Sequence, residues 1–434
     1  MDVITENTVN PAKRFSSFKS NWMTKLYEDI YSFYSTNSLS RDKLNYENGE
    51  VFNIHYGDIH TKFSTMFDLT KELVPIINVE VDLSKCEDEK YCQEGDLVIA
   101  DASEDYEDVG KTIELINLNN EKVLAGLHTF LARPNNYKMA KGFAGYLLQS
   151  WKVRRQVMVI AQGSKVLGIT KGRLGKVKLN IPEFEEQQKI ASFLSAVDEK
   201  IQQLNKKKEL LSAYKKGIMQ KIFSQELRFK DDSGNNYPDW EEKKLGDIGN
   251  FKTSSVDKLI KEGEQLVSLI NWMNVYKHQT ITNENTKELM QVSAQEKQIE
   301  ISNLKRGDIL FTPSSETPSD IGHSIVIFED LYNTLYSYHL MRFRPIINLD
   351  ILYSHYFCNV SSILKQISRF ATGSTRFTIS VGSFSKIIIQ LPSLEEQQKI
   401  ANFLSSIDSK IELVSTQIEN TKAFKKGLLQ QMFV

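Results

Sequence analysis

Two loops of this 434-residue chain combine the aromatic, amide and basic side chains that can contact nucleic-acid bases. The first loop follows an expected strand over 51–54 and supplies Tyr56, His60 and Lys62. The second follows an expected strand over 266–270 and supplies Asn271, Trp272, Asn274, Tyr276 and Lys277. Amides and lysines can pair with base edges in the major groove, and aromatic rings can pack on bases or sugars. We predict DNA contacts from these residues, with a core position for Trp272 as an equal alternative.

Two short turns carry side chains suited to binding phosphate. Each offers N–H groups, a hydroxyl and a cation, which is a phosphate-clamping set. The turns are Gly163-Ser164-Lys165 and Gly373-Ser374-Thr375-Arg376, and three arginines lie just upstream of them: Arg154, Arg155 and Arg369. We predict that the serines, Lys165, Thr375 and the four arginines contact DNA.

Charge is strongly segregated along the chain, although the formal net charge is only −1. Residues 68–108 hold 14 Asp and Glu against 3 Lys and Arg. Residues 133–178 hold 11 Lys and Arg and no acidic residue. Such segregation indicates a surface that faces a polyanion better than total charge does. The alternative is a solvated basic face that compensates the acidic stretch.

Residue patterns of catalysis and metal binding are missing from the sequence. No Gly-rich loop ends in Gly-Lys-Ser/Thr, so nucleotide hydrolysis is not expected. Asn10-Pro11-Ala12-Lys13 lacks the second proline and the aromatic residue of an amino-methyltransferase loop. Pro238-Asp239 with Glu242 and Lys244 resembles a nuclease motif in letters only, and the 7 His and 3 Cys show no metal-ligand spacing. We predict no catalytic residue, no metal site and no cofactor in this chain.

A stretch of 42 residues occurs twice and must help to position these loops. Residues 182–223 and 392–433 align without a gap at an offset of 210 and match at 21 of 42 positions. Apolar residues recur in both at alternating steps of four and three, the spacing of a coiled-coil seam. We expect the two helices to pack on each other, antiparallel, rather than to remain independent surface helices. The seam, which is also the expected coiled-coil interface, comprises Ile190, Leu194, Val197, Ile201, Leu204, Leu211, Ile400, Leu404, Ile407, Ile411, Val414 and Ile418.

Both helices are expected to begin in the same way. Pro182 and Pro392 are placed in the first helical turn, where a missing N–H costs least. Two glutamates follow each proline, and the positive end of the helix dipole favours their carboxylates. Lysines interrupt both seams near their ends, at Lys215 and Lys425.

The regions before the two helices share scattered anchors, such as Gly95-Asp96 with Gly307-Asp308. The chain is therefore divided into a first domain over 1–181, a helix over 182–223, a second domain over 224–391 and a helix over 392–434. Strands are expected over 51–54, 96–100, 112–118, 266–270, 308–312 and 324–328, and helices over 142–153 and 349–368. We predict an α+β fold of two pseudo-repeated domains joined by two long helices that form an antiparallel coiled coil.

Composition is that of an ordinary globular chain, with 41% hydrophobic and 25% charged residues. No apolar run approaches the ~20 residues of a membrane span. The N-terminal segment has no apolar signal region, and three cysteines are too few for a disulfide framework. We expect a cytoplasmic protein.

The helix repeats open with Glu-Glu-Gln-Gln-Lys-Ile-Ala at 185–191 and 395–401, and an Ala-x-Gly-Ser anchor precedes each of them. With this duplicated architecture, the chain resembles the specificity subunit of Type I restriction–modification systems over essentially its whole length. In this family each half carries a target-recognition domain, and the chain itself has no catalytic activity. The first copy departs from the family's Gly-Ser-Thr turn, because Lys165 stands where Thr375 stands in the second copy.

The resemblance implies a bipartite, asymmetric target on double-stranded DNA and two methyltransferase subunits docked on the helices. It also implies restriction subunits bound through the methyltransferase. S-adenosylmethionine, ATP and Mg²⁺ would then belong to those partners, which methylate adenine and cleave DNA. The main alternative is a coiled-coil scaffold without sequence-specific DNA binding, and the basic stretch 133–178 argues against it.

Overall fold

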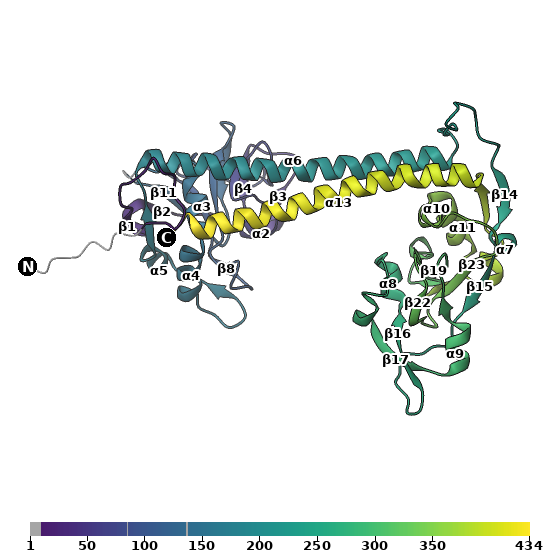
Figure 1. Cartoon of the computed structure of the whole chain (residues 1–434). Coiled ribbons are helices and arrows are strands. Elements are labelled where there is room, and N and C mark those ends of the chain that lie inside the picture. The colour runs from purple at the N-terminus through teal and green to yellow at the C-terminus, as the bar shows by residue number, and fades with distance from the viewer. Residues whose placement is uncertain (1–9, 85, 136–137) are drawn as a thin grey trace, which may run out of the picture. The chain divides into compact units, whose positions relative to one another are not determined.

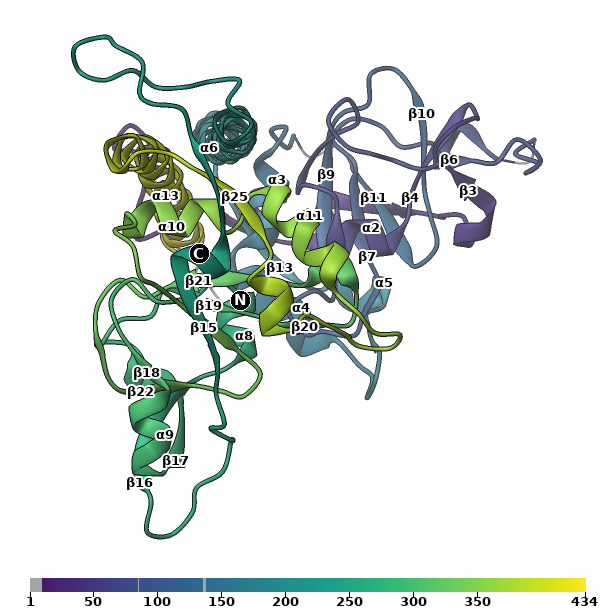
Figure 2. The same ribbon diagram turned by 90° about the vertical axis from the view of Figure 1, so that its right-hand side faces the viewer.

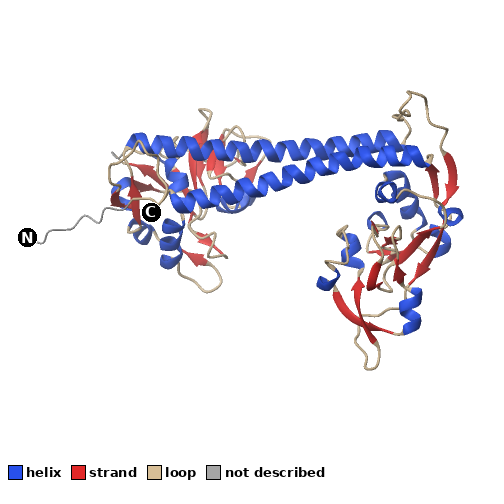
Figure 3. Cartoon of the chain, in the orientation of Figure 1, coloured by secondary structure: helices blue, strands red, loops and turns tan. Residues whose placement is uncertain are grey.

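The computed structural model describes residues 10–84, 86–135 and 138–434. Residues 1–9, part of the segment expected to lack a secretion signal, lie outside the described residues. The chain folds into two compact units: unit 1 comprises residues 1–205 and 416–434, and unit 2 comprises residues 206–415. Both units mix helices and strands, which confirms the α+β class (Figure 3). The domain boundaries taken from the sequence repeat stay a prediction.

Unit 1 contains a five-stranded and a four-stranded sheet. Their strand orders are β2-β11-β7-β9-β5 and β10-β4-β6-β3. The middle strand of the larger sheet, β7 (Leu97–Ala100), has all four side chains buried, as its uninterrupted apolar run requires. The other strands are β2 (Tyr31–Tyr34), β11 (Thr129–Pro134), β9 (Thr112–Asn117), β5 (Met66–Asp68), β10 (Lys122–Ala125), β4 (Val51–Ile54), β6 (Ile76–Ile77) and β3 (Leu44–Asn45).

Unit 2 contains two four-stranded sheets, with orders β15-β23-β19-β21 and β17-β16-β22-β18 (Figure 2). In the first sheet, β19 (Ile309–Phe311) is fully buried and pairs antiparallel with both neighbours. It corresponds to β7 of unit 1. The remaining strands are β15 (Gly249–Thr253), β23 (Met341–Pro345), β21 (Ser324–Val326), β17 (Met290–Ala294), β16 (Gln265–Ile270), β22 (Leu331–Tyr336) and β18 (Asn303–Leu304).

Each region predicted to be one helix after the sheets is two helices. Ser150 and Val360 adopt extended backbone angles and interrupt the two regions. Both side chains are buried, so each break is a packed feature of the core. The resulting helices are α3 (Phe143–Gln149) and α4 (Trp151–Ile160) in unit 1, and α10 (Ile351–Phe357) and α11 (Ser361–Phe370) in unit 2.

A short two-stranded sheet leads into each long helix. In unit 1, β1 (Met23–Leu26) pairs with β13 (Lys178–Ile181), which continues into α6 (Phe184–Phe223). In unit 2, β14 (Glu241–Lys244) pairs with β25 (Ile388–Leu391), which continues into α13 (Leu394–Gln431).

The long helices α6 and α13 contribute one segment each to both units, and within each unit these segments are antiparallel (Figure 1). In unit 1, Ile190 near the start of α6 shares a buried core with Met432 just beyond the end of α13. In unit 2, Ile222 near the end of α6 shares a core with Ile400 near the start of α13. Every predicted seam residue is buried or half-buried. The predicted antiparallel packing is confirmed.

The helix starts differ from the prediction. Pro182 and Pro392 lie two residues before the first helical residues. Glu186 does more than complement the helix dipole: its carboxylate is fully buried and receives hydrogen bonds from Arg14 Nε at 2.7 Å and Arg14 Nη2 at 2.6 Å. A buried charge needs such a partner. In unit 2, Arg228 binds the buried Glu396 in the same way.

The glutamine that follows this glutamate joins the helix to the domain before it. Gln187 Oε1 accepts a hydrogen bond from the Ala140 N–H at 2.9 Å, while its Nε2 donates to the Pro182 carbonyl at 3.0 Å. Gln397 makes the equivalent pair of bonds in unit 2. The Glu-Gln pairs that recur at 186–187 and 396–397 are therefore explained by contacts within each unit.

Candidate nucleic-acid interface

Three elements distant in sequence meet at one corner of unit 1. They are the short helix α2 (Tyr56–Thr61), strand β8 (Ala102–Ser103) and strand β12 (Leu167–Gly168). Strands β8 and β12 pair antiparallel. His60 Nε2 lies 2.9 Å from the carbonyl oxygen of Ala102 and donates to it, because a carbonyl can only accept. The predicted residues of α2 and the Gly-Ser turn before β12 are thus brought to one corner.

Unit 2 builds the same corner from α8 (Trp272–Tyr276), β20 (Ser314–Ser315) and β24 (Phe377–Thr378). The Trp272 indole N–H donates to the carbonyl of Ser314 at 3.0 Å, which is the counterpart of the His60 bond. Arg376 Nη2 donates to the Ser314 hydroxyl at 3.3 Å. The second turn therefore contacts the strand beside α8 directly.

Aromatic side chains cover both corners. Trp272 is half-buried and stacks on Tyr276 with ring centroids 4.5 Å apart. Its indole N–H anchors the loop while part of the ring remains accessible, so Trp272 is not simply a core residue. In unit 1, Tyr56 packs edge-on against His128 at 5.3 Å.

The two amides predicted to reach bases are engaged locally. Asn271 Oδ1 accepts from the Met273 N–H, and Asn274 Oδ1 accepts from the Asn271 N–H, both at 2.9 Å. This reciprocal pair caps α8, as asparagine at a helix start is suited to do. Lys277, just after the helix, is exposed.

Lys62 is partly committed to a buried carboxylate. Its Nζ lies 3.0 Å from Asp58 Oδ1, and Arg41 Nη1 lies 2.7 Å from Asp58 Oδ2. Burial opposes ionisation of Asp58, but the hydrogen bonds and charges of Arg41 and Lys62 outweigh it and lower the pKa of Asp58. The Lys62 side chain nevertheless remains about half exposed.

The Gly-Ser turns have glycine for a steric reason. Gly163 and Gly373 have φ values of 138° and 144°, a region that side chains rarely adopt. A Cβ atom on Gly163 would overlap the carbonyl oxygen of Val166. The residues that follow the glycines are exposed: Ser164, Lys165, Ser374, Thr375 and Arg376.

The three upstream arginines divide into two kinds. Arg154 Nη2 donates to the carbonyls of Glu107 and Val109 at 2.9 and 2.7 Å, and burial lowers the pKa of this guanidinium. Arg154 therefore fixes the loop after β8. Arg155 and Arg369 are exposed.

A pair of histidines in unit 2 was not among the residues predicted from the sequence to contact DNA. His278 Nε2 lies 3.2 Å from His323 Nδ1, His323 Nε2 lies 2.9 Å from Asp320 Oδ1, and His278 Nδ1 lies 3.0 Å from the Ser324 carbonyl. The carbonyl only accepts, and so does the carboxylate when ionised, so all three bonds form together only when the pair carries one extra proton. The His323 ring packs against Tyr276, with ring centroids 4.7 Å apart. The adjacency of His278 to Lys277 was the only sequence signal.

The basic stretch 133–178 also divides into two groups. Arg133 binds Asp96 and Lys141 binds Glu94, so part of the stretch does compensate the acidic region. Lys171 donates to the Tyr34 carbonyl. Seven other cations are exposed and form no ion pair among the described residues: Lys138, Lys152, Arg155, Lys165, Arg173, Lys176 and Lys178.

The described residues contain no group of three or more His, Cys, Asp or Glu side chains placed to hold a metal ion. Within the same residues, no helix combines the length and the apolar character needed to cross a membrane.

A family model described as the type I restriction modification DNA specificity domain matches the chain twice, over residues 20–212 and 237–422. The putative MjaX specificity subunit of a type I restriction enzyme from Methanocaldococcus jannaschii is 27% identical over 353 residues, covering 77% of this chain and 76% of the relative. The MjaVIII specificity subunit of the same organism is 25% identical, covering 65% and 68%.

Solved structures agree in fold. The type I restriction–modification S subunit from M. genitalium aligns with a TM-score of 0.53 at 14% identity, covering 98% of this chain and 99% of that structure. A chain from a structural study of assembly and conformational transition in the type I R-M system aligns with a TM-score of 0.60 at 14% identity, covering 94% and 96%. With two family matches that together span most of its length, this chain belongs to the type I restriction–modification DNA specificity family.

Proposed function

We propose that each unit reads one part of a bipartite, asymmetric DNA target. One observation carries this proposal: both units build the same corner from a short helix, an edge strand and a Gly-Ser turn, yet place different side chains on it. Unit 1 offers Tyr56, His60 and Lys165, whereas unit 2 offers Trp272, Tyr276 and Arg376 in the equivalent elements. Different side chains on one scaffold favour different base sequences, because bases are distinguished by the groups at their edges.

The long helices are the proposed docking sites for two methyltransferase subunits. Tyr214 of α6 and Phe424 of α13 occupy equivalent positions of the repeat and are 52% and 50% exposed. Exposed aromatic side chains are common anchors of protein interfaces. Two equivalent anchors fit two copies of one partner. In this proposal the partners supply the methyl donor, ATP and Mg²⁺, and this chain supplies no catalytic group.

The test is a map of adenine methylation in cells that contain the methyltransferase with or without this chain. A bipartite methylated motif should appear only when the chain is present. Methylation that is unchanged by deletion of the chain would refute the proposal and favour the scaffold alternative.

Docking is tested separately by native mass spectrometry of the purified complex. Tyr214→Asp or Phe424→Asp alone should leave one methyltransferase bound, and the double variant should leave none. Two methyltransferases on the double variant would show that these aromatics are not the anchors.

A further inference from the structure

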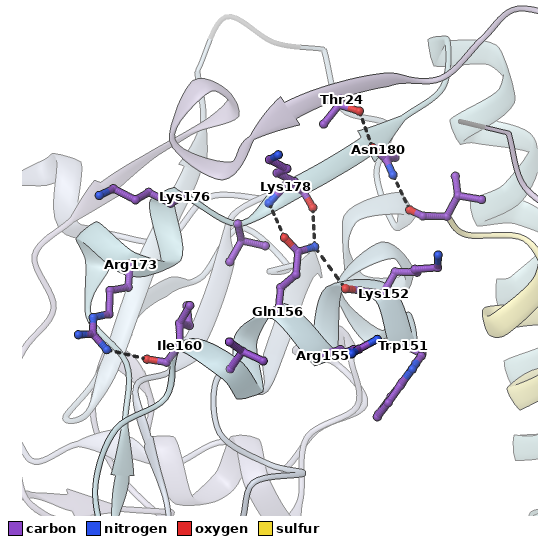
Figure 4. Close-up of a pocket in the computed structure, with 13 residues that line it drawn as sticks. Thr24, Trp151, Lys152, Arg155, Gln156, Ile160, Arg173, Lys176, Lys178 and Asn180 are labelled. Carbon is purple, nitrogen blue, oxygen red and sulfur yellow. Dashed lines mark hydrogen bonds between the residues drawn. The ribbon is translucent and has the colours of Figure 1, made fainter. Parts of the chain in front are cut away.

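Unit 1 has a groove that is separate from the proposed reading corner. It has a volume of about 760 Å³ and lies among α4, α5 (Lys171–Gly175), β1 and β13 (Figure 4). The groove is lined by Thr24, Trp151, Lys152, Arg155, Gln156, Val159, Ile160, Arg173, Lys176, Val177, Lys178, Asn180 and Val434. Five of these side chains are cationic, and none of the lining side chains is a carboxylate.

The five cations are available to a ligand. All of them are exposed, and none forms an ion pair within the described part of the chain. Four of the five side chains make no hydrogen bond among the described residues, and Arg173 uses one N–H group on the Ile160 carbonyl. By contrast, Arg133 and Lys141 are paired with carboxylates, and Arg154 is buried against two loop carbonyls. Five like charges gathered without a counter-charge on any lining side chain repel one another, and a bound polyanion lowers that cost.

The frame that carries these cations is fixed by hydrogen bonds (Figure 4). Gln156 Oε1 accepts from the Lys178 N–H at 2.9 Å, and Gln156 Nε2 donates to the Lys178 carbonyl at 2.9 Å, which joins α4 to β13. Arg173 Nη1 donates to the Ile160 carbonyl at 3.2 Å. These hydrogen bonds hold in place the helices and the strand that carry the charged side chains.

The groove also exposes apolar surface. Trp151 at the start of α4 is 55% exposed and Val159 on the same helix is 77% exposed. An exposed aromatic ring beside unpaired cations can pack on the sugars of a nucleic-acid backbone whose phosphates the cations hold.

Unit 2 repeats the frame but keeps only two of the five cations, with Lys365 and Lys386 at the repeat positions of Arg155 and Lys176. Gln366 bonds both main-chain groups of Ile388 as Gln156 does with Lys178. At the repeat positions of Lys152, Arg173 and Lys178, however, unit 2 has Ser362, Ser383 and Ile388. Ser361 replaces Trp151, and Glu242 takes the place of Thr24 in the β1-type strand. The frame folds without cations at the positions of Lys152, Arg173 and Lys178, so these three are not a structural requirement.

We infer that this groove of unit 1 binds the phosphate backbone of duplex DNA, independently of sequence, as a second contact beside the reading corner. The inference rests on the proposed function, because it assumes that the chain acts on DNA. If the groove binds DNA in this way, unit 1 should bind DNA of any sequence more tightly than unit 2 does.

The test uses the full chain and a mixed-sequence 40-base-pair duplex, with binding followed by fluorescence anisotropy across a series of KCl concentrations. The triple variant Lys152→Ser, Arg173→Ser, Lys178→Ile places in unit 1 the residues that the same frame holds in unit 2. Each lost phosphate contact should lower the slope of log Kd against log salt by about 0.9, so the slope should fall by about 2–3 and Kd should rise roughly tenfold or more.

The matched control removes the same charge elsewhere, through Lys206→Ser, Lys207→Ser and Lys208→Ser on the exposed part of α6. Its slope should fall by less than about 1. Arg155→Glu, a single exposed change, provides a second variant should the triple variant not fold. Arg155→Glu should raise Kd, and lower the slope of log Kd against log salt, by at least as much as the loss of one phosphate contact.

The outcomes separate the two claims. A wild-type chain that binds no duplex at low salt would refute the proposed function and this inference together. Wild-type binding with unchanged Kd and slope in the groove variants would refute the groove alone. Unchanged DNA binding with loss of methyltransferase co-purification would instead make the groove a protein-docking site and overturn the inference.

Discussion

Lys425 Nζ lies 2.7 Å from Asp198 Oδ1 and joins the end of α13 to the start of α6 within unit 1. Tyr146 of α3 donates its hydroxyl to the same carboxylate at 2.9 Å. Unit 2 repeats this arrangement, with Lys215, Asp408 and Tyr356. Both lysines interrupt the apolar seam in the sequence, and the pairing explains why a cation is tolerated there.

Replacing Asp198 with Asn should lower the free energy of unfolding of unit 1 by about 1–2 kcal/mol, because the ion pair is only partly exposed and three groups share it. Denaturant melts of the full chain measure this change. The exposed pair Lys206–Glu209 on the same helix provides the control, and Lys206→Ala should cost less than about 0.5 kcal/mol. Equal losses in the two variants would contradict the structural role.

Replacing Arg14 with Ala leaves the fully buried Glu186 without its cation and should cost about 3–5 kcal/mol. The equivalent change Arg228→Ala should cost less, because the Trp240 indole N–H still donates to Glu396 at 2.9 Å. The Trp22 indole N–H of unit 1 has no hydrogen-bond partner among the described residues.

The comparison is made by measuring the thermal unfolding of the two variants side by side. Arg14→Ala should have the lower Tm. A lower Tm for Arg228→Ala would show that the tryptophan bond does not compensate.

The buried carboxyl group of Glu114 should make the stability of the fold depend on pH. Its carboxylate accepts the N–H groups of Gly142 and Gly145 at 2.6 and 2.7 Å, but burial dominates and raises the pKa of Glu114 to about 7. The folded state then binds a proton more tightly than the unfolded state, whose pKa is near the ordinary 4.5. The contribution of Glu114 to stability is therefore present below pH 4.5 and is lost as pH rises towards 7.

The measurement is the difference in unfolding free energy between wild type and Glu114→Gln from pH 4.5 to 8. The wild-type advantage should shrink with rising pH, by at most about 1.4 kcal/mol per pH unit, and level off above pH 7. A difference that stays constant over this range would contradict a raised pKa.

Gly373→Ala should disturb the second turn, because the added Cβ would overlap the Arg376 carbonyl at a φ of 144°. We expect a loss of about 1–3 kcal/mol in stability and weaker DNA binding by unit 2. Gly217→Ala on α6 is the opposite case, since nothing lies within 4 Å of its added Cβ. It should stabilise the chain by up to about 1 kcal/mol. Equal effects of both changes on unfolding would refute the steric reading of the turn.

Local and periodic features were predictable from the sequence. The seam of α6 and α13 was visible because a coiled coil repeats its apolar positions at fixed steps. The prolines were misplaced by two residues because helix ends depend on contacts outside the helix, here those of Gln187 and Gln397.

Contacts between distant residues were not predictable. Glu186 looked like an ordinary helix-start glutamate because its partner Arg14 lies 172 residues away. The lysines and arginines of 133–178 cannot be told apart by residue type. In the structure, however, Arg133 is paired with Asp96, whereas Lys178 lines the groove. The reading loops were chosen by residue type, and the structure does gather them into two corners. Which of their side chains touch bases stays a prediction.

The central claim, one target part per unit, is tested most directly by mapping adenine methylation with variants of a single corner. Tyr276→Ala with Lys277→Ala in unit 2 should relax the base preference in one part of the methylated motif and leave the other part unchanged. Tyr56→Ala in unit 1 should relax the opposite part. If either variant changed both parts together, or neither variant changed any base preference, the account of two independent reading units would be wrong.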